Sequence, residues 1–437
     1  MSTRIGGIDV GNEQTRRALW DSTWDGIFAT VMIGLVDTFG VGGAVALGVP
    51  SVPIALLSSL PVWLGTLAQL GLRRRLAGQR RKPWVVTAVR IQGTVLLVLA
   101  LTGWAPAAWA PWLYAGGFVV YGASNAAVGH LWMSWYADVC PEAVVGRMMA
   151  WRSTLFACVQ LVTTVTAGCL SRPFNSDTAP WVLYAGVFAA AGLARHASAA
   201  FLHRQYEPFP AEQPALARSF EPTVALRRFA RAVAALHGAA LMAGPFFAVW
   251  FLRDLRWNYL TFAVAAASTV AGQLVANSFV GRLADKLGAA RVLLGSAAAA
   301  AIVPIPYVLC EDHRVLWLAN FYSGIAWASV NVAAFKYLAQ VSRGIPHRSG
   351  FVYANVWLTS SVVAMSLVGG FLAPRLPTVF AWPLQTLFFA SCCLRIVIVL
   401  ALFTRLIDLE PTDALRRWRP GRLFQIFRWS GPGTTHL

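Results

Sequence analysis

Long apolar stretches alternate with short polar ones along the 437 residues of this chain. A helix that crosses the hydrocarbon core of a bilayer needs ~20 mostly apolar residues, and twelve runs meet that length. They lie at 22–45, 49–71, 83–104, 109–136, 147–170, 180–203, 231–252, 258–280, 290–310, 314–340, 350–372 and 383–405. Helices are expected because each satisfies its own backbone hydrogen bonds in hydrocarbon. The pattern predicts an all-α membrane protein with 12 transmembrane helices.

The polar segments between these runs predict the domain organisation. A proline-rich stretch at 204–230 separates two sets of six runs. We therefore expect an N-terminal six-helix bundle with a cytoplasmic tail at 1–203, a cytoplasmic central loop at 204–230, a C-terminal six-helix bundle at 231–405 and a basic cytoplasmic tail at 406–437. The last segment mixes Arg with Trp, Phe and Leu, which favours contact with the anionic inner leaflet. A disordered tail is the alternative.

The charges support a membrane protein and orient it. Only 12% of the residues are charged and 57% are apolar, whereas soluble domains carry about 25% charged residues. The formal charge of +18 would by itself suggest nucleic-acid binding. Most Lys and Arg residues, however, fall in loops that face the cytoplasm if both termini do, and the outer loops hold only Arg172, Arg253, Arg256, Arg314 and Arg375. This bias follows the positive-inside rule, so we expect a bacterial-type inner membrane location, a lipid partner and no nucleic acid.

One loop carries a motif that names a family. After the eighth run the sequence reads Gly281-Arg282-Leu283-Ala284-Asp285-Lys286-Leu287-Gly288-Ala289-Ala290-Arg291. This segment resembles the signature G-x-L-A-D-[RK]-x-G-x-[RK]-[RK] of the major facilitator superfamily, which lies between helices 8 and 9 and again between helices 2 and 3. A degraded copy begins at Gly65, with Gln69 in place of the acid. The resemblance implies the fold of that superfamily, with two pseudo-symmetric six-helix bundles.

The signature also implies a cytoplasmic gate. In the resembled family Asp285 would approach the positive end of a neighbouring helix, with Lys286, Arg291 and Arg348 as partners. These contacts would close the cytoplasmic side and break when the bundles rock. The alternative is that Asp285 and its neighbours only fix the loop. Because Gln69 has no charge, a gate in the first half would be weaker.

Asp37 is the acid that lies deepest within an apolar run. A charge in hydrocarbon costs several kcal/mol, and no basic residue is near it in the sequence. In the resembled family helix 1 lines the central cavity, where an acid often binds the coupling proton. We therefore expect Asp37 to couple protons or cations, with a structural carboxylate as the alternative. Asp21 and Asp25 lie nearer the inner boundary and are expected at the interface.

Five bases lie within the runs. Arg90, Arg195 and Arg395 fall in helices that are peripheral in the resembled family, and most of the five are close enough to the inner face to extend toward it. Arg152 and Lys336 are better candidates for the cavity. If either faces it, that residue would favour an anionic substrate or pair with Asp37.

Uncharged side chains complete the candidate site. Asn125 and Trp132 share a helical face in the fourth run, as do Trp327 and Asn331 in the tenth. Hydrogen bonding between helices is the common alternative role for such residues.

Together these features favour a secondary active transporter. It would move a small solute by alternating access with proton or ion coupling, as a monomer. The sequence shows no phosphate-binding G-x-x-x-x-G-K-[ST] loop, catalytic triad or metal-ligand cluster, so we expect neither an enzyme nor a bound cofactor. A non-transporting membrane sensor or assembly factor on the same scaffold is the alternative.

Overall fold

The computed structural model describes residues 4–75, 79–174, 180–208, 221–342 and 347–407. Its first half contains a two-stranded hairpin, β1 (Arg4–Ile5) and β2 (Ile8–Asp9), and then α1 (Glu13–Ala46), α2 (Ser51–Arg75), α3 (Lys82–Leu101), α4 (Ala110–Val139), α5 (Glu142–Leu170) and α6 (Pro180–Arg204). Its second half contains α7 (Val224–Val249), α8 (Tyr259–Leu287), α9 (Ala289–Ala301), α10 (Ile305–Leu309), α11 (His313–Val341), α12 (His347–Leu372), α13 (Pro383–Ile398) and α14 (Thr404–Ile407). Short 3₁₀ turns η1 (Thr102–Trp104) and η2 (Arg172–Phe174) follow α3 and α5, and π-helical segments η3 (Trp250–Asp254) and η4 (Val399–Phe403) extend α7 and α13.

The first helix begins earlier than its apolar run predicts. Asn12 caps it, since its side chain accepts a hydrogen bond from the backbone N–H of Thr15 at 2.7 Å. The antiparallel hairpin before it pairs Arg4 with Asp9 and Ile5 with Ile8, and Ile5 is fully buried. The polar N-terminal segment is therefore partly folded against the bundle.

The ninth apolar run is divided between two helices. Pro304 and Pro306 lie between the end of α9 and the middle of α10. A proline lacks the backbone N–H and clashes with the preceding turn, so a continuous helix cannot pass through both. Every other predicted run overlaps one helix or a helix with its 3₁₀ or π-helical extension, and the last run also reaches the first two residues of α14.

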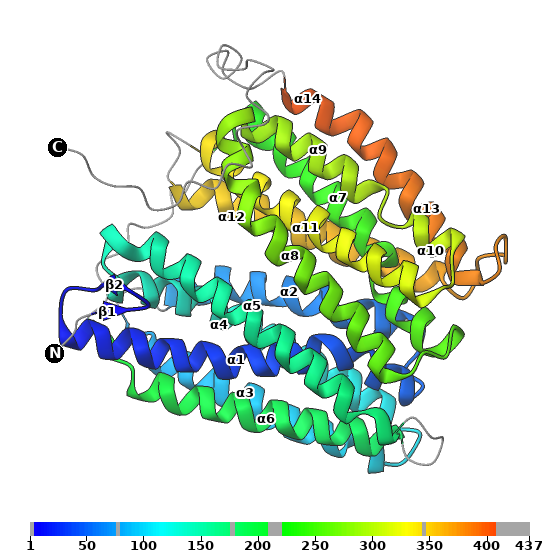
Figure 1. Cartoon of the computed structure of the whole chain (residues 1–437), viewed down its shortest axis with the longest axis horizontal. Coiled ribbons are helices and arrows are strands. Elements are labelled where there is room, and N and C mark those ends of the chain that lie inside the picture. The colour runs from blue at the N-terminus through cyan, green and yellow to red at the C-terminus, as the bar shows by residue number, and fades with distance from the viewer. Residues whose placement is uncertain (1–3, 76–78, 175–179, 209–220, 343–346, 408–437) are drawn as a thin grey trace.

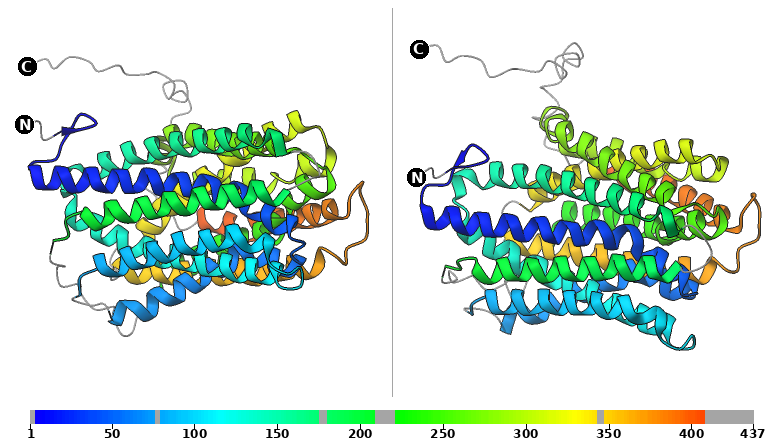
Figure 2. Two further views of the ribbon diagram at one scale, coloured as in Figure 1. Left: turned by 90° about the horizontal axis from the view of Figure 1, so that it is seen from below. Right: turned by 60° about the horizontal axis from the view of Figure 1, so that its bottom comes forward.

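The helices form two bundles that lie side by side (Figures 1 and 2). In the first, α6 packs between α1 and α3, while α4 contacts α2 and α3. In the second, α7 packs on α12 and α13, while α11 packs on α8 and α9. The bundles meet mainly where α2 packs against α12 and α5 packs against α8.

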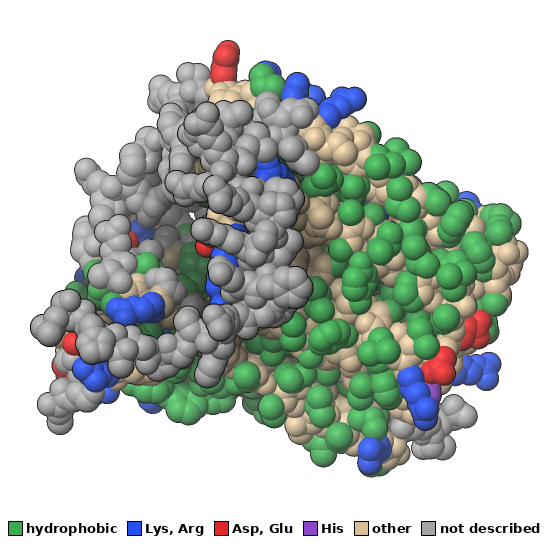
Figure 3. Space-filling view, turned by 45° about the horizontal axis from the view of Figure 1, so that its top comes forward, with side chains coloured by type: hydrophobic (Ala, Val, Ile, Leu, Met, Phe, Trp, Pro, Cys, Tyr) green, Lys and Arg blue, Asp and Glu red, His purple; other side chains and the backbone are tan. Residues whose placement is uncertain are grey.

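The outer surface matches a membrane protein. Ten described helical segments are long and apolar enough to cross a bilayer. The other two long helices, α4 and α11, have 30 and 29 residues and are not among these ten. Figure 3 shows a broad hydrophobic surface with the charged side chains gathered toward its ends. Leu101, Leu193, Leu318 and Leu400 are among the exposed large hydrophobic residues of the described chain, and extensive apolar surface indicates contact with lipid.

Candidate functional site

Asp37 lies on the inner face of α1. Its neighbour Thr38 approaches Thr164 of α5 at 3.4 Å, and Gly40 accepts a hydrogen bond from Tyr114 of α4. Phe39 packs against Tyr184 of α6 on the opposite face. Asp37 therefore points between α4 and α5, away from the outer helix α6.

The surroundings of Asp37 leave its carboxylate free. The side chain is solvent-exposed although its neighbours Val36 and Thr38 are buried. Within the described part of the chain no hydrogen bond or salt bridge reaches it, and the side chain that it influences electrostatically is Tyr121 of α4. Arg152 and Lys336 do not pair with Asp37. Arg152 donates to Ser22, and Lys336 forms a salt bridge with Asp285.

The candidate polar residues of α4 and α11 are placed differently. Asn125 is half-buried and Asn331 is exposed in the middle of α11, where it interacts with His237 of α7. Trp327 packs edge-on against the His237 ring, with 5.1 Å between the centroids. Asn331 is thus exposed, whereas Trp327 packs within the C-terminal bundle.

Arg152 is enclosed within the N-terminal bundle. Its guanidinium lies over the rings of Trp132, Tyr136 and Phe156 at 4.8–5.1 Å from their centroids. It donates to the side chain and backbone oxygens of Ser22 at 2.9 and 3.0 Å. Arg152, which is buried, and Trp132, which is half-buried, therefore belong to one cation–π cluster within the N-terminal bundle.

A buried acid lies beside this cluster, which corrects the expectation that Asp25 is interfacial. Only 4% of Asp25 is exposed, and its carboxylate accepts a hydrogen bond from Ser198 at 2.6 Å. Ser198 accepts one from Arg195 at 3.0 Å, and Arg195 also donates to Gln92 at 2.7 Å. Because Asp25 interacts electrostatically with Arg195 and Arg152, this one carboxylate partly compensates the charges of two buried arginines.

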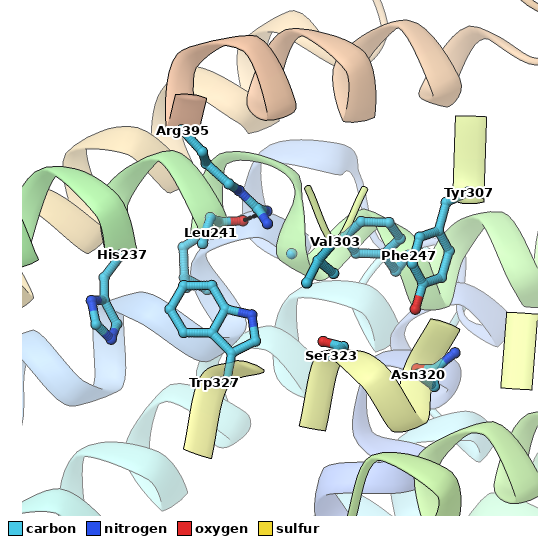
Figure 4. A pocket seen from close by; sticks show the side chains of 11 residues that line it. His237, Leu241, Phe247, Val303, Tyr307, Asn320, Ser323, Trp327 and Arg395 are labelled. Atoms are coloured by element: carbon cyan, nitrogen blue, oxygen red, sulfur yellow. Dashed lines mark hydrogen bonds between the residues drawn. The ribbon is translucent and has the colours of Figure 1, made fainter. Parts of the chain in front are cut away.

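Arg395 is also buried rather than extended toward the inner face. It donates to Ser391 at 3.1 Å and to the backbone oxygens of Ala300 and Ala240 at 3.2 and 3.4 Å. It lines a cavity of about 310 Å³ within the C-terminal bundle, which we call the Arg395 cavity. The other polar side chains of its wall are His237, Tyr307, Asn320, Ser323 and Trp327. In Figure 4 Arg395 extends from α13 toward Trp327, while Ser323, Asn320 and Tyr307 lie farther along the wall.

The signature residues have partners other than those expected. Asp285 forms a salt bridge with Lys336 of α11, not with Lys286 or Arg291. Arg291 donates to the backbone oxygen of Leu287 at 3.4 Å, and Lys286 is exposed. This ion pair joins two helices of the same bundle, so Lys336 belongs to the signature region rather than to the space beside Asp37.

The glycines of the two signature copies have structural roles that differ. Gly288 adopts φ +93° where α8 gives way to α9, a conformation that favours glycine. Gly281 has open space beside it, whereas a Cβ at Gly65 would lie 2.2 Å from that of Ala126 in α4. Gly65 therefore permits close packing of α2 on α4. The side chains of Gln69 and Arg348 lie outside those that the structure describes.

Comparisons with known proteins concern the fold. No protein-family model matches the sequence, and no curated protein is similar enough to it to count as a relative. Among solved structures, the nucleoside transporter NupG superposes with a TM-score of 0.64 at 12% identity over 90% of this chain and 100% of that one. A bacterial homologue of the iron transporter ferroportin, in an inward-facing state, gives 0.63 at 12% over 89% and 98%. The xylose transporter XylE from E. coli, partially occluded and inward open, gives 0.63 at 10% over 89% and 96%.

These matches cover nearly the whole of each chain. The protein thus shares the fold of these membrane transporters, which is the fold that the signature loop implies.

Proposed function

We propose that this protein is a secondary active transporter that moves a small solute by alternating access, with Asp37 as the coupling carboxylate. The observation that carries the proposal is an exposed acid on the inner face of α1, between buried neighbours, with no hydrogen-bond or salt-bridge partner among the described residues. The bundles at 1–203 and 231–405 would be the rocking bodies of a monomer. The chain would lie in a bacterial-type inner membrane with both termini in the cytoplasm.

The physical basis of coupling is the charge of Asp37. An unpaired carboxylate tolerates an open, hydrated space, but enclosing it in a dry one costs several kcal/mol. Protonation removes that charge, so the empty carrier could close around a protonated Asp37 more readily than around an ionised one. The gradient of protons would then set the direction of net solute movement.

Proton-driven accumulation in proteoliposomes tests the proposal. A panel of labelled nucleosides, sugars, carboxylates and amino acids is supplied to the proteoliposomes with and without an inwardly directed proton gradient. Asp37→Asn should reduce gradient-driven accumulation at least tenfold and spare solute exchange at equal pH, because only the coupling charge is lost. Asp312→Asn is the matched control, since Asp312 is an exposed acid whose side chain caps α11 and asparagine also caps helices.

Two results would count against this function. Unchanged accumulation by Asp37→Asn would remove Asp37 from coupling. Wild-type flux no higher than that of protein-free liposomes for every solute, despite verified folding, would favour a non-transporting role.

A further inference from the structure

Arg395 is a buried cation without an acid. It is 2% exposed, and no Asp or Glu in the described ranges forms a salt bridge with it. Its acceptors are a serine hydroxyl and two backbone carbonyls, all of them neutral. Burying an ion without a counter-charge costs several kcal/mol, so a negative charge bound beside Arg395 would offset part of that cost.

The space beside Arg395 is not filled by protein. The guanidinium lines the Arg395 cavity, whose volume lies near the lower end of the range for small-molecule sites. The guanidinium carbon of Arg395 lies over the Trp327 ring, 6.0 Å from the ring centroid. Phe247 and Leu241 contribute apolar surface to the wall. Asn320 and Ser323 add hydrogen-bonding groups on α11 (Figure 4). A charged group at one side and apolar walls elsewhere suit an amphipathic ligand.

The wall also limits the charge of a ligand. Arg395 is the one permanently charged side chain among the lining residues, all of which the structure describes. A carboxylate would be neutralised by a single guanidinium through paired hydrogen bonds. A phosphate monoester would keep an excess negative charge within the bundle, and a cation would meet Arg395 without any acid.

We propose that the Arg395 cavity binds a small organic monoanion, whose carboxylate pairs with Arg395 and whose apolar body packs against Trp327. This site is distinct from Asp37 and lies within one bundle. Binding there requires neither coupling nor transport, so the inference goes beyond the proposed function and can hold or fail independently of it.

Charge-matched probes test the site on the purified full chain. Calorimetric titrations compare benzoate and phenylacetate with benzamide, which has nearly the shape of benzoate but no charge. Benzoate should bind at least tenfold more tightly than benzamide, because only the anion compensates Arg395. Equal binding of the two, or no binding of either carboxylate, would overturn the proposal.

Substitutions then locate the binding. Arg395→Gln should weaken benzoate binding at least tenfold, while Arg395→Lys, which keeps the charge, should recover part of it. Arg90→Gln is the matched control, because Arg90 is exposed on α3 and should leave binding unchanged. Undiminished binding by Arg395→Gln would contradict the assignment.

A second variant leaves Arg395 in place. Ser323→Leu narrows the cavity and should also weaken benzoate binding at least tenfold. It decides the question if Arg395→Gln does not fold. Wild-type affinity in a folded Ser323→Leu protein would exclude the cavity as the binding site.

Discussion

Corresponding helices of the two bundles, α6 and α13, each bury one arginine, and the two arginines are compensated differently. Arg195 belongs to a network that includes Ser198, Gln92 and the buried acid Asp25. Arg395 has only neutral acceptors among the described residues, and it borders a cavity. A buried charge that is balanced inside the protein makes the loss of either partner costly, because the other is left uncompensated. One that is not balanced leaves a position for a ligand.

The largest effect expected from this difference is on stability. Arg195→Gln would leave Asp25 buried with weaker compensation and should cost about 3 kcal/mol. Arg395→Gln leaves no acid behind and should cost only about 1 kcal/mol. Detergent unfolding titrations of the two variants measure both values under the same conditions.

Equal losses in the two variants would contradict this comparison. A double-mutant cycle sharpens it, because Asp25→Asn in the Arg195→Gln background removes the orphaned charge. We expect a coupling of at least about 1 kcal/mol between positions 25 and 195, and additive losses would show that the network is not a unit.

The signature ion pair should have the smallest effect on stability. The side chains of Asp285 and Lys336 are 72% and 27% exposed, and pairs that face solvent contribute about 0–1 kcal/mol. Lys336→Gln should therefore change unfolding little but alter the labelling of cysteines introduced at the cytoplasmic end, if the pair helps to set the conformational state. The control is Lys286→Gln, since Lys286 forms no salt bridge within the described ranges. Identical labelling in both variants would assign the pair to the loop alone.

The apolar runs predicted the helices well because membrane-length hydrophobicity is a property of composition. The start of α1 was missed, since the Asn12 cap and the first turns after it are polar. The break at Pro304 was also missed, because two prolines near the end of the ninth run lower its average hydropathy too little to divide the run. Local backbone chemistry decided both cases.

Side-chain placement was predicted less well, for a geometric reason. Helices that are apolar on nearly every face carry little periodicity from which orientation can be inferred. Asp25 and Arg395 were therefore assigned by depth along the helix, although rotation about the helix axis decides their environment. The Asp285–Lys336 pair joins residues on different helices, and its register depends on how α8 packs on α11. Asp37 stood out in the sequence because its charge contrasts with its apolar neighbours, and its role in coupling stays a prediction.

Alternating access itself is tested most directly by distances between spin labels on the two bundles, in protein whose native cysteines are replaced. One pair is placed at Arg204 and Arg282, exposed near the ends of α6 and α8, and a second at Leu101 and Leu309, exposed at the ends of α3 and α10. The distances are measured at acidic and at alkaline pH. We predict two distance populations for each pair, and a change of pH should shorten the first distance while it lengthens the second. A single, pH-independent distance in both pairs would contradict the account.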